Sequence, residues 1–145
     1  MESMWIMVAD ASRAHLYAQD TGNHGLSVLR EFSHPESRMK GIELASDRAG
    51  RLQGKDYGHS ANEPNDPKKY EAERFAIELA QALEQGRASG LFKQFMLVAP
   101  PHFNGLLKQH LTEHTRALLN VDIEKDFTQL SQSDLVKRLG EFIRL

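Results

Sequence analysis

Three short segments near the N-terminus have the hydrophobic pattern of β-strands. Residues 4–9 are apolar almost throughout, which is typical of a strand buried on both faces. Residues 13–18 alternate between apolar and polar side chains, and residues 26–32 follow a cluster of turn-forming residues. Because the links between these segments are short, the pattern predicts an antiparallel meander of three strands.

A long amphipathic helix is predicted in the middle of the chain. Between Ala72 and Leu83, apolar residues recur at spacings of three and four, which places them in a single stripe on one face of a helix. Asp66 suits the N-cap and Pro67 suits the first helical position. Gly86 or Gly90 can end the helix.

The last third of the chain alternates strands with helices. Residues 95–99 form a second fully apolar strand, and a helix through residues 103–111 follows. Residues 121–127 alternate as a strand with one polar face, and Ser131 or Ser133 then caps a last helix. The residues of that last helix expected to face inward are Leu135, Leu139, Phe142 and Ile143.

The order of these elements predicts the fold. Strands that alternate with helices imply right-handed crossovers and parallel pairing, and the meander before them makes the sheet mixed. We therefore expect an α/β domain with five strands in a ribonuclease H-like arrangement, order 3-2-1-4-5, in which strands 4–9 and 95–99 are central neighbours. The predicted core is one cluster, made of Ile6, Val8, Phe75, Leu79, Leu83, Leu97 and Val98.

The composition is that of an ordinary globular protein. The chain has 145 residues, 40% of them hydrophobic and 26% charged, so we expect one domain over residues 1–145. It has no cysteine, which excludes disulfide scaffolds, thiolate metal sites and thiol nucleophiles. The longest apolar run, residues 4–9, is far shorter than a membrane span of about 20 residues, and no signal peptide is visible. The sequence therefore predicts a cytoplasmic protein without membrane insertion.

The segment from Ser46 to Asp66 differs from the rest of the chain. Its only large apolar side chains are Leu52 and Tyr57, and glycine recurs at every fourth position from Gly50 to Gly58. This pattern predicts a loop of about 20 residues, and loops of that length are usually functional or disordered. With little to bury, this loop is expected to be the most mobile segment of the chain.

The charge of this region suggests a ligand. Residues 37–70 hold seven Lys or Arg and five Asp or Glu, a local charge of +2, against -4 for the rest of a chain whose total is -2. A basic arm on an acidic body suits RNA or phosphate, because cations neutralise phosphates and glycine lets backbone N–H groups approach. The alternative is a solvated loop of mixed charge. The candidate binding residues are Arg48, Gly50, Arg51, Lys55, Lys68 and Lys69.

Several motifs occur in order along nearly the whole chain. They are Trp5–Ala14, Ser46–Arg51, His59, Asp66–Pro67, Glu71–Ala76, Leu97–Pro101 with Phe103 and Gly105, and Lys125–Leu130. Together they resemble the bacterial host attachment protein family, which is named for a role in attachment to host cells. The resemblance implies a fold similar to the middle domain of archaeal and eukaryotic peptide-chain release factors. In that domain a loop between the third strand and the first helix carries a Gly-Gly-Gln motif that promotes peptidyl-tRNA hydrolysis.

The resemblance implies that the protein acts on tRNA or the ribosome through the loop at residues 46–66. Gln53 would be the counterpart of the catalytic glutamine, although Gly50 stands three residues before it and the Gly-Gly-Gln sequence is absent. A side-chain amide can place water against an ester, and His59, with an ordinary pKa of about 6.5, can act as general base. The alternative for both residues is a surface polar role, and the alternative for the protein is a non-enzymatic interaction module involved in attachment to host cells.

Two groups of residues could hold a metal ion, and each has a structural alternative. His110 and His114 have the i, i+4 spacing of a helical metal-binding pair, but Thr112 is expected to start a new helix between them and so to break their shared face. Asp10 ends the first strand and, with Asp126, could hold the magnesium of a nuclease, but a turn-forming role for Asp10 fits better. We expect no metal and no cofactor.

Overall fold

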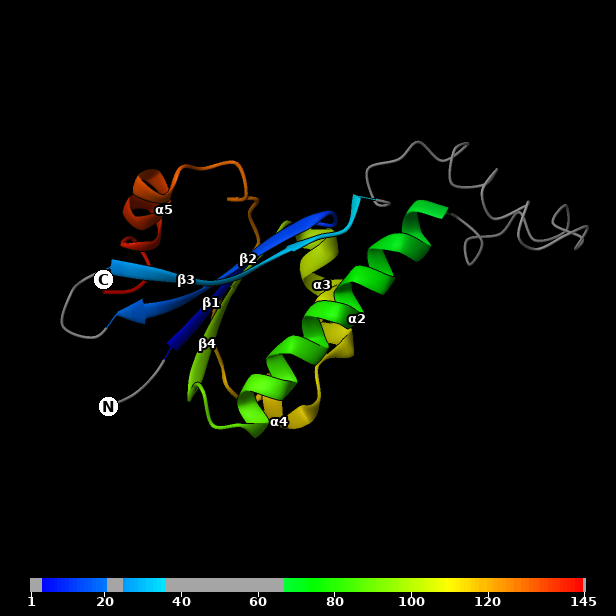
Figure 1. Cartoon of the computed structure of the whole chain (residues 1–145). Coiled ribbons are helices and arrows are strands. Elements are labelled where there is room, and N and C mark those ends of the chain that lie inside the picture. The colour runs from blue at the N-terminus through cyan, green and yellow to red at the C-terminus, as the bar shows by residue number, and fades with distance from the viewer. Residues whose placement is uncertain (1–3, 21–24, 36–66, 145) are drawn as a thin grey trace, which may run out of the picture.

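The structure is a computed structural model that describes residues 4–20, 25–35 and 67–144 (Figure 1). Its elements in chain order are β1 (Met4–Ala9), β2 (Arg13–Asp20), β3 (Gly25–Ser33), α2 (Pro67–Ala88), β4 (Gln94–Val98), α3 (Pro101–His110), α4 (Glu113–Arg116), β5 (Leu119–Ile123) and α5 (Gln132–Leu139). Among the described residues, no helix has both the length and the apolar character needed to cross a membrane.

The strands form one mixed sheet in the order β3-β2-β1-β4-β5. β1 pairs antiparallel with β2, which pairs antiparallel with β3, whereas β1 with β4 and β4 with β5 are parallel. Trp5 of β1 is opposite Ala18 of β2 on one side and Phe95 of β4 on the other. The predicted α/β fold, with its ribonuclease H-like strand order 3-2-1-4-5 and the two apolar strands as central neighbours, is confirmed.

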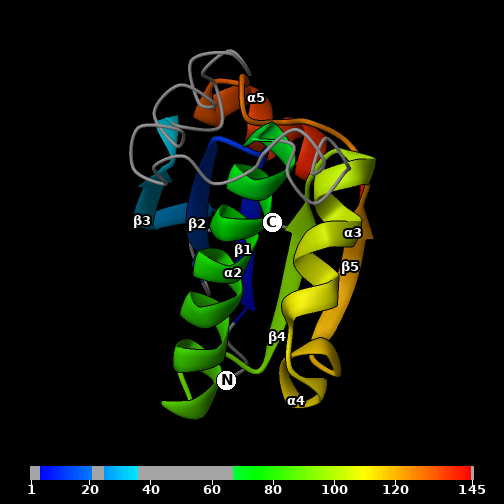
Figure 2. The same cartoon turned by 90° about the vertical axis from the view of Figure 1, so that its right-hand side faces the viewer.

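Helices cover both faces of the sheet. α2 and α3 lie side by side on one face, and α5 lies on the other (Figures 1 and 2). Because both faces of β1 and β4 are covered, neither strand has a solvent-facing side, which explains why their sequences are apolar without alternation.

The core therefore divides into two clusters, one on each face of the sheet. All seven residues predicted for the core are buried, each no more than 1% exposed. The prediction of a single cluster is wrong, because successive side chains of a strand point to opposite faces. The α2 side holds Phe75, Leu79, Leu83 and Leu97, and the α5 side holds Ile6, Val8 and Val98.

α2 ends in a glycine motif that leaves its C-terminal carbonyl groups satisfied. Leu91 N donates to Gly86 O at 2.9 Å and Gly90 N donates to Arg87 O at 3.0 Å. Gly90 has φ +70°, the left-handed conformation that this Schellman geometry requires and that glycine adopts without a Cβ clash. Of the two glycines predicted to end the helix, Gly90 does so, whereas Gly86 lies inside it. The predicted N-cap, Asp66, lies outside the described residues.

The C-terminal elements differ from the prediction in two details. β5 is Leu119–Ile123, not residues 121–127, and Phe127 instead packs, 4% exposed, in the cluster under α5. Ser131 caps α5 by accepting a hydrogen bond from Asp134 N at 3.1 Å. Phe142, predicted to face inward, is 44% exposed, because α5 ends at Leu139 and Phe142 no longer continues its buried face.

Candidate functional site

The residues that flank the predicted loop meet at one end of the molecule. β3 ends at Ser33 and α2 begins at Pro67, and the end of β3 lies beside the first turns of α2 (Figure 1). His34 Nε2 lies 2.8 Å from Glu71 Oε1 and so joins the two elements. The described residues on either side of residues 36–66 therefore meet at one place, which we call the root and define by His34, Glu71 and Arg74.

The root holds a buried carboxylate. Glu71 is 3% exposed, and burying a carboxylate is costly unless it is paired and hydrogen-bonded. Arg74 and His34 both compensate the charge of this carboxylate. The Arg74 Nη1 atom lies 3.7 Å from Glu71 Oε1. The His34 ring stacks on Phe75 with centroids 5.5 Å apart, and His34 N donates to Ser12 O at 2.8 Å. The root thus ties the β1–β2 turn, the end of β3 and α2 together.

Analysis of the sequence missed His34 and Glu71, although one signal was present. Glu71 lies four residues before Phe75, on the buried stripe of α2. A charged residue at such a position requires a partner, but the partner His34 directly follows β3 and lies 37 residues earlier in the chain.

Most of the predicted ligand-binding residues belong to the loop. Arg48, Gly50, Arg51, Lys55, Gln53 and His59 lie outside the described residues, as does the whole segment from residue 46 to residue 66. Lys68 and Lys69 are described, and both are exposed in the first turn of α2. The structure thus places these two predicted cations next to the root.

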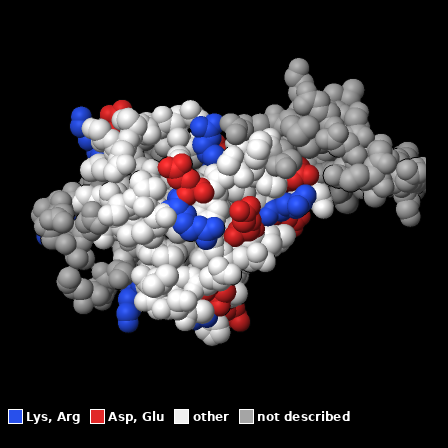
Figure 3. All heavy atoms as spheres, viewed as in Figure 1, with Lys and Arg blue, Asp and Glu red and all other residues white. Residues whose placement is uncertain are grey.

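An exposed aromatic ring follows the two lysines. Tyr70 is 45% exposed, and the Arg74 guanidinium lies 5.7 Å from the centroid of its ring. Elsewhere on the face seen in Figure 3, lysine and arginine are interspersed with aspartate and glutamate and form no broad field of one sign. Binding of a polyanion to this face would therefore depend on local groups and not on bulk charge.

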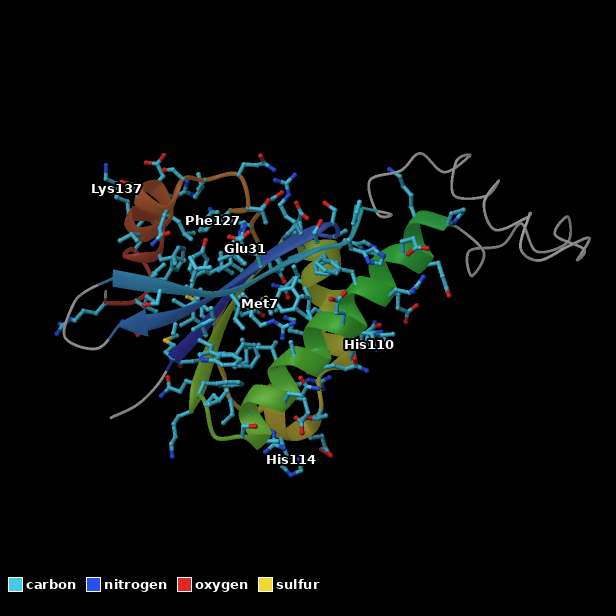
Figure 4. The ribbon with its side chains drawn as sticks, viewed as in Figure 1. Met7, Glu31, His110, His114, Phe127 and Lys137 are labelled. Atoms are coloured by element: carbon cyan, nitrogen blue, oxygen red, sulfur yellow. The ribbon has the colours of Figure 1, made fainter. Side chains whose placement is uncertain are left out.

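The two histidines with metal-pair spacing, His110 and His114, belong to different helices. Thr112 caps α4, accepting a hydrogen bond from Thr115 N at 3.1 Å, so a new helix begins between His110 and His114 as predicted. His110, the last residue of α3, lies beside α2, where its Nε2 is 3.0 Å from Glu73 Oε2, whereas His114 belongs to α4 (Figure 4). Over the described residues, no three His, Asp or Glu side chains come together as metal ligands would.

Asp10 shapes the turn between β1 and β2. Its Oδ1 accepts hydrogen bonds from Ser12 N at 2.8 Å and Arg13 N at 2.9 Å, which confirms the predicted turn-forming role. The Thr128 hydroxyl lies 3.1 Å from Asp10 Oδ2 and 2.5 Å from Asp126 Oδ1. The fold thus brings Asp126, which is distant in sequence, close to Asp10 and anchors the segment after β5 to this turn.

A second carboxylate links α2 to α4. Hydrogen bonds from Arg87, Thr115 and Thr112 lower the pKa of Glu84 to about 2 from its ordinary 4.5. Thr115 Oγ1 donates to Glu84 Oε1 at 2.6 Å, and Arg87 donates from two nitrogens at 2.9 and 2.7 Å. Because every partner is a protein group that fixes the end of α2, this arrangement serves the fold.

The family described as "Protein required for attachment to host cells" matches residues 5–139. The chain belongs to this family. The resemblance carried by the motifs is thereby confirmed, and the root, Lys68 and Lys69 all lie within the matched range. No curated protein matches the chain.

Several solved structures are similar to this attachment family protein. An archaeal translation termination factor, aRF1, is 12% identical with a TM-score of 0.46 over 96% of this chain and 38% of its own. A structure titled "Archaeal protein" is 15% identical with a TM-score of 0.46, and the match covers 97% of this chain and 39% of the other chain. The Aquifex aeolicus Ppx/GppA phosphatase is 11% identical with a TM-score of 0.39, and the match covers 85% of this chain and 35% of the phosphatase. The chain thus spans less than two fifths of each of these structures, and the similarity concerns the fold alone.

Proposed function

We propose that this attachment family protein binds tRNA or the ribosome through the basic segment at residues 46–66, with the folded body as a rigid support. One observation carries the proposal: the contact of His34 with the buried Glu71 holds both flanks of that segment at one place, beside the exposed Lys68 and Lys69. Anchoring both ends of a segment lowers the entropy that it loses when it binds a ligand. The proposal places the protein in the cytoplasm, where its partners are.

The chemistry of the segment suits a phosphate backbone. Arg48, Arg51 and Lys55 add three cations to those of Lys68 and Lys69, and glycine at position 50 lets backbone N–H groups approach a phosphate closely. Cations that neutralise phosphates release counterions, so affinity of this kind falls steeply with salt and depends little on base sequence.

The resemblance to release factors adds a chemical step to the proposal. In that step the Gln53 amide orients a water molecule, and His59 takes its proton as the water oxygen attacks the ester carbonyl of peptidyl-tRNA. The ester C–O bond breaks, His59 returns the proton to the leaving oxygen, and the tRNA leaves with a free hydroxyl group. Gln53→Ala should then abolish release of the peptide but leave binding of the tRNA intact.

Filter binding of the wild type and of an Arg48→Ala, Arg51→Ala double variant to tRNA and ribosomes, at several salt concentrations, tests the binding step. We expect the double variant to bind all RNA sequences more weakly, with a salt slope smaller by about one for each lost phosphate contact. Its free energy of unfolding should differ from that of the wild type by less than about 0.5 kcal/mol, because both substitutions are expected on the surface. Copurification with ribosomes from a lysate at low salt, lost at high salt, is expected as well.

The alternative is a non-enzymatic protein-interaction module involved in attachment to host cells. This alternative predicts that the wild type has no affinity for RNA, so the double variant should show no loss of binding. If the wild-type protein binds neither tRNA nor ribosomes even at low salt, the proposed role in translation is wrong and this alternative remains.

A further inference from the structure

β3 carries an exposed arginine whose position is fixed by packing. The Arg30 guanidinium lies 4.4 Å from the centroid of the Phe32 ring, two residues further along the same strand. Phe32 is buried, 6% exposed, whereas Arg30 is exposed. A guanidinium that stacks on a ring keeps its N–H groups in a flat fork at its edge, and this fork matches the paired oxygens of a phosphate. Arg30 is therefore a preorganised donor for an anion.

The described part of the protein offers this fork no anion. None of the carboxylates there forms an ion pair with Arg30, and no hydrogen bond there involves its guanidinium. Glu31, the next residue, is opposite His15 on the α5 side of the sheet, whereas Arg30 is opposite Leu16 on the α2 side. Since the two side chains point to opposite faces, Glu31 does not compensate the charge of Arg30.

Arg30 lies on the same side of the sheet as the root. β3 continues from Arg30 through Phe32 toward His34, which spans about 13 Å over four extended residues. The end of the strand meets α2 at the root (Figure 1). There Arg74 adds a second cation, whose side chain is 56% exposed. A polyanion bound at the root can therefore continue along this side of β3 and reach Arg30.

We propose that Arg30 is a phosphate contact for the RNA that binds the basic segment, so that the RNA runs from the root along β3. The proposal rests on the function proposed above and adds to it a binding residue on the folded body. Phosphates repeat along an RNA backbone, so one strand can meet both Arg74 and Arg30. Because the contact is to the backbone, it is independent of base identity.

Filter binding of tRNA at several salt concentrations tests this contact. Arg30→Gln removes the charge but keeps part of the stem over Phe32. It should weaken binding roughly 3- to 10-fold at low salt and lower the salt slope by about one. Arg30→Lys keeps the charge and should retain the slope. Arg138→Gln is the matched control. Its guanidinium also lies over a ring, 4.8 Å from the centroid of Phe127, but on α5 at the other face of the sheet, so this variant should bind like the wild type.

The outcomes separate this proposal from the one on which it rests. If the wild type binds tRNA and Arg30→Gln keeps its affinity and slope, the role of Arg30 is wrong and binding by the basic segment remains. An equal loss in Arg30→Gln and Arg138→Gln also overturns it, because net charge alone would then explain both. Wild type that binds no tRNA even at low salt overturns both proposals. Thermal unfolding of Arg30→Gln at the wild-type temperature shows that a loss of affinity is not a loss of fold.

Discussion

Replacement of Gly86 by alanine tests the close packing of α2 against Trp5 of β1. A Cβ at Gly86 would lie 2.4 Å from Trp5 Cη2, 2.5 Å from Trp5 Cζ3 and 3.1 Å from Phe92 Cε1. Both rings are buried, 8% and 3% exposed, and their centroids are 4.6 Å apart. Neither ring can move away from the new methyl group without displacing other core side chains.

Two opposing terms set the size of the effect. Alanine gains up to about 1 kcal/mol over glycine inside a helix. Overpacking a well-filled core costs about 1–3 kcal/mol, and contacts below 3.0 Å with a ring place this site at the upper end of that range. We therefore expect Gly86→Ala to lower the free energy of unfolding by about 1–2 kcal/mol, which corresponds to roughly 2–8 °C in the unfolding temperature of a domain of this size.

Gly105 provides the matched control. It lies in α3, is exposed, and has no heavy atom within 4 Å of the position that a Cβ would occupy. Gly105→Ala has the same helical gain without the clash, so it should raise the free energy of unfolding by up to about 1 kcal/mol. Urea denaturation followed by circular dichroism measures both variants, and the same substitution should change stability in opposite directions.

A double-mutant cycle identifies Trp5 as the cause. Trp5→Phe removes the Cη2 and Cζ3 atoms with which the new methyl group collides. In that background Gly86→Ala should therefore cost less than it does in the wild type, and the difference is the coupling energy between the two sites. A Gly86→Ala protein as stable as the wild type, or an equal cost in both backgrounds, would refute the reasoning.

Three further predictions concern stability. Phe75→Ala should cost about 3–5 kcal/mol in urea denaturation, because Phe75 is fully buried between the root and Phe103; a loss below about 1 kcal/mol would contradict its place in the core. The pKa of Glu84 is lowered to about 2, so its contribution to stability is present above pH 4.5 and lost as the pH falls toward 2. The free energy of unfolding of Glu84→Gln should therefore fall less than that of the wild type over this pH range. The same pH dependence in both proteins would contradict this role of Glu84. Ser131→Ala should cost about 1 kcal/mol in thermal unfolding, by removal of the α5 cap, whereas Ser133→Ala should cost little.

Much of the fold could be predicted because its signals are local. The apolar stripe from Ala72 to Leu83 follows the period of a helix, and α2 has its buried residues there. The apolar runs at β1 and β4 predict strands covered on both faces, and these two strands are the central neighbours of the sheet. Phe142 was misplaced because periodicity does not fix where a helix stops, and α5 ends before it.

The candidate site was predicted only in part. Lys68 and Lys69 were identified as candidate phosphate-binding residues by the local excess of basic residues, and both are exposed in the structure. Tyr70 and Arg74 have the helical spacing of neighbours, but whether their face is outward depends on how α2 rotates against the sheet. His34 and Glu71 are separated by 37 positions, and no period links a strand end to a helix stripe.

The sequence by itself determined which segments are helices and strands, apart from some of their ends, because periods of 2 and 3.6 residues record which side chains each element buries. The strand order followed from the succession of these elements, because strands that alternate with helices pair in parallel through right-handed crossovers. The tertiary structure alone decided the two-sided division of the core, the pairing of His34 with Glu71 and the approach of Thr128 to Asp10. These features depend on contacts between segments far apart in the chain. Such contacts are set by how α2 and α5 pack on opposite faces of the sheet, and this packing leaves no local pattern in the sequence.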